Sequence, residues 1–163
     1  MYFGIISSET KEIKMEWKIN HAIVYPTVDC AIFYSNTYDE IYLARKPNQD
    51  KWRFVGGFVD PNDFSYQQAA LREAFEETGL ECKLGEFVTS VKINDPRYND
   101  KEDKIITTMF TMFSWNDENA KPMDDISELK LFNFSLLRED DFVPEHRDLF
   151  RALKEWVNKK KGR

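Results

Sequence analysis

Short apolar runs separated by polar turns divide most of the chain into extended segments. Runs rich in β-branched and aromatic residues, bounded by Gly, Pro, Asn or Asp, are typical of β-strands. By this criterion we expect strands at residues 28–34, 40–46, 52–59, 86–93, 105–115 and 129–134. Gly56 and Gly57 interrupt the third run, which predicts a bend or a close approach of another part of the chain.

A helix is expected in the middle of the chain. Ser65 followed three positions later by Gln68 is typical of a capping box at a helix N-terminus. Gly79 stands where a left-handed residue commonly ends a helix. These signals predict a helix over residues 66–78.

A second helix is expected near the C-terminus, from about Pro144, because proline suits the first helical turn. Its apolar positions recur at the helical period and are Leu149, Phe150, Leu153, Trp156 and Val157. His146 precedes this face and has no partner histidine nearby in sequence, so we expect a capping or surface role for it. Six strands and two helices predict a mixed α/β sandwich.

The N-terminal residues have the weakest pattern. Residues 13–19 alternate only slightly and could form an edge strand or a dimer contact, so we treat residues 1–20 as an extension of a single domain over 21–163. This segment has no apolar stretch of the kind found in signal peptides. No segment approaches the roughly 20 apolar residues that a membrane span needs. We therefore expect a cytoplasmic protein with no membrane partner.

The overall charge restricts the partners that the protein can bind. Lys and Arg total 23 and Asp and Glu total 29, which gives a formal net charge of −6 in a chain of 163 residues. Such a chain repels phosphate backbones, so we expect no nucleic-acid partner. An anionic small molecule would need another source of positive charge, and a divalent metal ion would supply it.

Carboxylates gather on one side of the central helix. At about 100° per residue, Glu73, Glu76 and Glu77 fall within an arc of roughly 100°. We expect the opposite side to be apolar, with Leu71, Ala74 and Phe75. Like charges one turn apart repel unless a cation lies among them, and clustered carboxylates suit Mg²⁺ or Mn²⁺. A solvated acidic face is the alternative interpretation.

The segment over residues 57–80 resembles the Nudix box, whose pattern is G, five residues, E, seven residues, and R-E-U-x-E-E-x-G-U with U aliphatic. The second half matches at every fixed position, namely Arg72, Glu73, Ala74, Glu76, Glu77, Gly79 and Leu80. The first half departs from the pattern in two ways. Asp63 stands in place of Glu, and eight residues instead of seven separate it from Arg72. A salt bridge, a helix cap and no role at all remain open for Asp63.

The resemblance implies an α/β/α sandwich with a mixed sheet and metal-dependent hydrolysis of a nucleoside diphosphate linked to another group. Catalytic and metal-binding roles fall on Glu73, Glu76 and Glu77, and the Gly57 carbonyl is a further expected metal ligand. Structural roles fall on Arg72, which would orient Glu76, and on Gly79. The general base is one of the box glutamates or an acid from a late loop, and the candidates there are Asp124, Asp125 and Glu128.

Five segments carry a narrower similarity, at residues 52–63, 69–80, 95–98, 122–132 and 143–150. Together they resemble the Nudix part of bifunctional nicotinamide-mononucleotide adenylyltransferases. This similarity implies ADP-ribose as substrate, with AMP and ribose 5-phosphate as products. The residues assigned to substrate binding are Arg53, Arg97, Asp124 and Asp125. Two alternatives remain: a Nudix hydrolase of another nucleotide, and a sensor that binds a nucleotide without turnover. A homodimer is expected, because Nudix enzymes acting on ADP-ribose are often dimers.

Overall fold

The computed structural model describes residues 23–95 and 104–162. The strands are β1 (Val24–Tyr34), β2 (Glu40–Arg45), β3 (Val55–Phe58), β4 (Lys83–Ile93), β5 (Lys104–Ser114) and β6 (Glu128–Asn133). The α-helices are α1 (Tyr66–Thr78) and α2 (Arg147–Lys160), and short 3₁₀ turns occupy Phe134–Leu136, Glu139–Asp141 and Pro144–His146. The predicted order of strands and helices is confirmed, and α1 has the predicted bounds.

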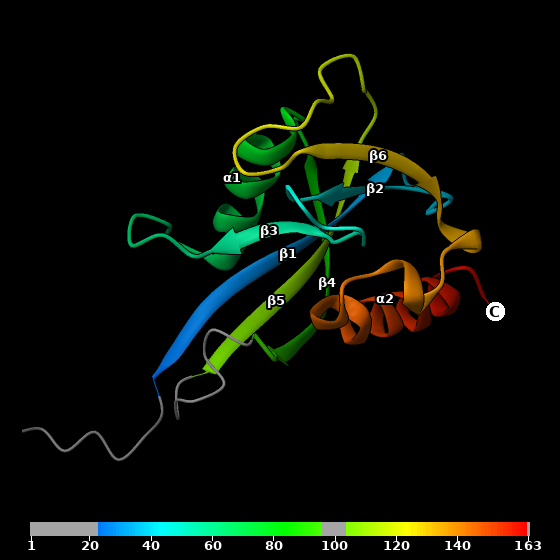
Figure 1. Cartoon of the computed structure of the whole chain (residues 1–163). Coiled ribbons are helices and arrows are strands. Elements are labelled where there is room, and N and C mark those ends of the chain that lie inside the picture. The colour runs from blue at the N-terminus through cyan, green and yellow to red at the C-terminus, as the bar shows by residue number, and fades with distance from the viewer. Residues whose placement is uncertain (1–22, 96–103, 163) are drawn as a thin grey trace, which may run out of the picture.

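One mixed sheet organises the molecule around β1. The strand order is β4-β5-β1-β2-β6, and β3 also pairs with β1. The β1–β5 pair is parallel, whereas the other pairs are antiparallel. Because β2 pairs with the C-terminal end of β1 and β3 pairs with its N-terminal half, the sheet divides beside β1 (Figure 1).

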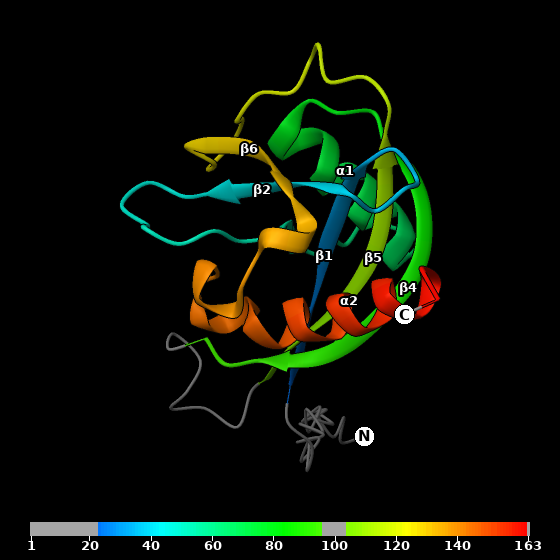
Figure 2. The ribbon, with the colours of Figure 1, turned by 90° about the vertical axis from the view of Figure 1, so that its right-hand side faces the viewer.

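The two faces of β1 contribute to two separate cores. Val28, Cys30 and Ile32 belong to the core that contains the buried alanines of α1. The intervening Ala31 and Phe33 belong to the core that contains the apolar face of α2. Alternation of side chains along a strand therefore places the helices on opposite faces, with β1 and β5 between them (Figure 2). The expected α/β/α sandwich is confirmed.

The apolar face predicted for α1 is right for Ala74, which is buried, and wrong for Leu71 and Phe75. Leu71 and Phe75 are 37% and 52% exposed, whereas Ala69, Ala70 and Ala74 are fully buried. Small side chains let the helix backbone approach the sheet closely, which larger side chains would prevent. The helix packs on β1 and β3 through this alanine face.

Two expectations fall outside the part of the chain that the structure describes. These are the edge strand or dimer contact within residues 1–20 and the substrate-binding role of Arg97 in the loop between β4 and β5. Among the helices in the described segments, none has both the length and the apolar character needed to cross a bilayer.

The alanine face gives a direct stability prediction. Ala70→Leu should lower the free energy of unfolding by about 1–3 kcal/mol, because the added carbons have no space between α1 and the sheet. Phe75→Ala should change it by less than about 0.5 kcal/mol, because that ring is half exposed. Urea denaturation of both variants measures the difference, and a larger loss in Phe75→Ala would contradict the observed rotation of α1.

Candidate active site

A cleft of about 550 Å³ opens where β3 leaves the side of β1. Its walls come from β1, from β3 and the loop after it, from α1, and from the loop before β6. His146, at the end of the turn that precedes α2, also lines it. Segments from distant parts of the sequence therefore converge on one cavity.

Both ends of α1 have the caps that the sequence predicts, and these fix which residues face the cleft. The Ser65 hydroxyl accepts the Gln68 N–H at 3.1 Å, although the Gln68 side chain accepts the N–H of Phe64 rather than that of Ser65. Gly79 has a φ of 68° and its N–H donates to the Phe75 carbonyl at 2.8 Å. With this register, Glu73 and Glu77 both line the cleft.

The carboxylates of α1 are in close contact with the glycines of β3. The Gly56 N–H donates to Oε2 of Glu77 at 2.9 Å. A Cβ at Gly57 would lie 2.7 Å from Oε2 of Glu73, so any side chain there would displace the Glu73 carboxylate from its position against the strand. Burial raises the pKa of Glu77 to about 8 and also raises the pKa of Glu73. A cation bound in the cleft would favour the ionised forms of both groups.

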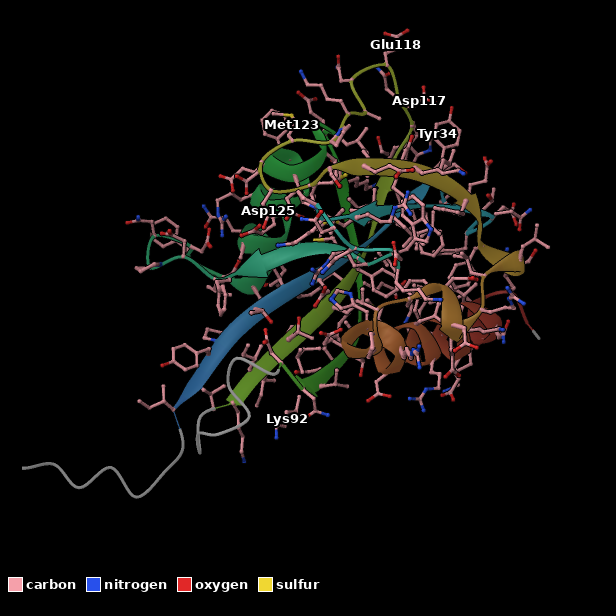
Figure 3. All side chains as sticks on the ribbon, in the orientation of Figure 1. Tyr34, Lys92, Asp117, Glu118, Met123 and Asp125 are labelled. Atoms are coloured by element: carbon pink, nitrogen blue, oxygen red, sulfur yellow. The ribbon has the colours of Figure 1, made fainter. Side chains whose placement is uncertain are left out.

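Two acids from the loop before β6 approach Glu77. Oxygen atoms of Glu77, Asp124 and Asp125 all lie within 4.8 Å of one another. The loop is attached to the end of α1, because the N–H groups of Lys121 and Met123 donate to the carbonyls of Thr78 and Glu77. Figure 3 shows the loop crossing α1, with Asp125 beside the helix. Lys46 forms an ion pair with Asp125.

Arg72 connects the altered first half of the box to the helix. Its guanidinium donates to Asp63 at 2.7 Å, to Glu73 at 2.8 Å and to Glu76 at 2.9 Å. It also donates to the carbonyl of Phe58 at 3.1 Å. Of the roles left open for Asp63, the structure shows the salt bridge, and this interaction holds the pKa of Asp63 below its usual value. The predicted pairing of Arg72 with Glu76 is present.

The sequence-predicted residues do not all reach the cleft. Glu73, Glu77, Gly57, Arg53, Asp124 and Asp125 line it. The Glu76 side chain is 51% exposed and is held by Arg72, so its role as a metal ligand stays a prediction. Glu128 instead forms an ion pair with Arg45 and is absent from the residues that line the cleft within the described segments.

Two buried cleft residues were missed by sequence reasoning. His146 is 4% exposed and its Nδ1 accepts the Phe54 N–H at 3.1 Å, so a surface role is wrong. It occupies the N-cap position of α2, as one of the two expected roles requires, but its side chain makes no capping hydrogen bond. Asp29 lies within β1 and is 6% exposed. The signal available for Asp29 was a carboxylate inside an otherwise apolar strand, since buried acids need a partner or a function.

Comparisons with known sequences agree with this architecture. A family model described as a NUDIX domain matches residues 25–153. The CTP pyrophosphohydrolase of Escherichia coli (strain K12) is 44% identical over 55 residues, which are 31% of this chain and 40% of that protein. The diphosphoinositol polyphosphate phosphohydrolase 3-beta of Bos taurus is 30% identical over 89 residues, which are 54% of each chain. The matches thus span about half, or less, of these relatives.

Solved structures share the fold at low sequence identity. The E. coli ORF135 protein has a TM-score of 0.63 and 22% identity, covering 82% of this chain and 91% of that one. The NUDIX domain of Shewanella oneidensis NrtR, solved with ADP ribose, has a TM-score of 0.62 and 20% identity, covering 83% and 88%. Because the family model matches most of the sequence and the fold agrees with it, this chain belongs to the NUDIX domain family.

Proposed function

We propose that this protein is a metal-dependent Nudix hydrolase that cleaves the diphosphate bond of a nucleoside diphosphate derivative. The observation that carries the proposal is the group of three carboxylates, Glu77, Asp124 and Asp125, with oxygen atoms within 4.8 Å of one another. One of the three is buried, and a cation bound among them would add to the positive charge that Lys46 supplies to Asp125.

The donor set fits a hard divalent cation. Every side-chain donor in the group is a carboxylate oxygen, which suits Mg²⁺ or Mn²⁺. The box residues Glu73 and Glu77, with the Gly57 carbonyl, would hold the metal, and Glu76 stays a predicted ligand. When bound, the metal neutralises diphosphate oxygens and lowers the pKa of a coordinated water.

The remaining cleft residues supply binding and proton transfer. Lys46 and Arg53 line the same cavity, and their positive charges favour the phosphate oxygens of the substrate. Asp124 and Asp125 face Glu77 from the opposite loop, where one of them can accept the proton of the attacking water. Arg72 takes no part in this chemistry and instead keeps Glu73 in position.

ADP-ribose is the substrate that we propose, giving AMP and ribose 5-phosphate. The resemblance of the box region to ADP-ribose-specific Nudix domains supports this choice, and the fold matches an NrtR domain solved with ADP ribose. The names of other similar proteins include a CTP pyrophosphohydrolase and a UDP-X diphosphatase, so other nucleotides are the alternative. The intact Glu73, Glu76 and Glu77 support turnover rather than sensing alone.

A substrate panel tests the activity. With Mg²⁺ present, ADP-ribose should yield AMP and ribose 5-phosphate faster than CTP, UDP-glucose or a dinucleoside polyphosphate, with products identified by chromatography. EDTA should abolish turnover and added Mg²⁺ should restore it. Intact ADP-ribose beside a hydrolysed alternative would reject the substrate, and tight binding without any turnover would favour a sensor.

Removal of one buried carboxylate charge tests the metal site. Glu77→Gln keeps the size of the side chain and an oxygen acceptor for the Gly56 N–H. It should lower kcat by more than about 100-fold, because a neutral amide is a poor ligand for Mg²⁺. Glu118→Gln, on the exposed loop labelled in Figure 3, is the matched control and should retain full activity. Equal rates in the two variants would contradict the assignment.

The Arg72–Asp63 pair gives a separate prediction about positioning. Asp63→Ala frees one side of the guanidinium, so Arg72 orients Glu73 less firmly. We expect an about 10- to 100-fold loss of activity, with a higher Mg²⁺ concentration needed for half-maximal rate. Asp50→Ala removes an exposed carboxylate outside the cleft and serves as the control. An unchanged Mg²⁺ dependence would show that Asp63 does not act through the metal ligands.

A further inference from the structure

Two nitrogen-bearing side chains meet at the wall of the cleft. Arg53 stands two residues before β3, and His146 ends the 3₁₀ turn that precedes α2. Both side chains line the cleft, and that of His146 is only 6% exposed. Nη2 of Arg53 lies 3.3 Å from Nε2 of His146. The nature of this contact depends on which ring nitrogen carries the proton.

The backbone of Phe54 fixes the position of the ring proton. The Phe54 N–H donates to Nδ1 of His146 at 3.1 Å. An imidazole nitrogen that accepts a hydrogen bond has no proton of its own, so the neutral ring carries its proton on Nε2. Stacking on Phe54, with ring centroids 5.8 Å apart, holds the imidazole in this orientation. Burial and the charges of Arg53 and Lys46 keep the pKa of His146 well below its usual value, which agrees with a neutral ring.

The contact between Arg53 and His146 is therefore a meeting of two donors. A guanidinium has no acceptor atom and a protonated Nε2 has no free lone pair, so neither group can bond to the other. Within residues 23–95 and 104–162, neither of these two nitrogens has an acceptor. The Asp29 carboxylate comes closest to the ring at Nδ1, at 3.6 Å, and accepts no hydrogen bond from Nε2. A buried N–H without an acceptor is costly, so this geometry favours an acceptor supplied by a ligand.

We propose that Nε2 of His146 and Nη2 of Arg53 together donate to one oxygen of the substrate's diphosphate. Two donors 3.3 Å apart can both reach a single oxygen at the usual N–H···O lengths of about 2.7–3.2 Å. The acceptor is anionic, because Arg53 is charged and Lys46 lines the same cleft. His146 is thus a substrate-binding residue, and the inference rests on the proposed function because it adds a contact to the same diphosphate.

Nitrogen NMR of the ring tests the donor directly. The chain has two histidines, so His21→Asn leaves only the imidazole signals of His146. We expect a proton on Nε2 and none on Nδ1. With Mg²⁺ present, methylenediphosphonate should shift the Nε2 signal, since this diphosphate analogue has a P–C–P bridge that resists hydrolysis. A proton on Nδ1, or an Nε2 signal that the bound probe leaves unchanged, would overturn the proposal.

Two amide variants separate the roles of the two ring nitrogens. In His146→Asn the amide oxygen can take the place of Nδ1 and accept the Phe54 N–H, but no donor reaches the place of Nε2. Calorimetry should show that this variant binds methylenediphosphonate at least about 10-fold more weakly. His146→Gln places an amide nitrogen near the position of Nε2 and should recover part of the affinity. Lys154→Gln, on the exposed side of α2, is the control and should bind as the unmodified protein does.

Equal affinities of the asparagine and glutamine variants would contradict the donor role of Nε2. If melting curves show that neither variant folds, the NMR titration still decides, because it keeps His146 in place. The probe is not turned over, so absent nucleotide hydrolysis beside His146-dependent binding would reject only the enzymatic activity. Normal hydrolysis beside an unchanged Nε2 signal would reject only this inference. Failure of the probe to bind the unmodified protein would overturn it as well.

Discussion

The contact between the paired glycines of β3 and the carboxylates of α1 is the constraint on which the site depends. Glu77 can be buried because the Gly56 N–H reaches it, and Glu73 can approach the strand because Gly57 has no side chain. Such an approach also requires small residues on the sheet-facing side of α1, where three alanines are buried. The small residues of β3 and of α1 thus determine how closely the carboxylates of the helix approach the strand.

Much of the fold could be predicted because its signals are local. The bounds of α1 followed from Ser65, Gln68 and Gly79, whose hydrogen bonds involve residues within four positions of them. The strands followed from β-branched and aromatic runs bounded by turns. Arg72 and Glu76 are four residues apart on one helix, so their ion pair depends only on helical geometry. Spacing along one element was sufficient for each of these features.

The parts that were missed depend on contacts between distant segments. The burial of Ala70 rather than Phe75 is decided by how closely α1 can approach the sheet, which a single helix does not specify. His146 and Phe54 are joined by a hydrogen bond across 92 positions of sequence. Asp63 departs from the family pattern, and only the folded loop shows that its carboxylate reaches Arg72. Tertiary packing supplied the information in every case.

The parallel pairing of β1 with β5 has a consequence for how the chain acquires its structure. Val24 lies opposite Lys104, so the centre of the sheet joins segments that are synthesised far apart in time. Closing such a long loop costs conformational entropy before any strand contact offsets it, which slows folding in proteins dominated by distant pairings. Helix α1 is therefore synthesised before β5 can complete the sheet, and during that interval the edge of β1 that pairs with β5 is open to association with other chains.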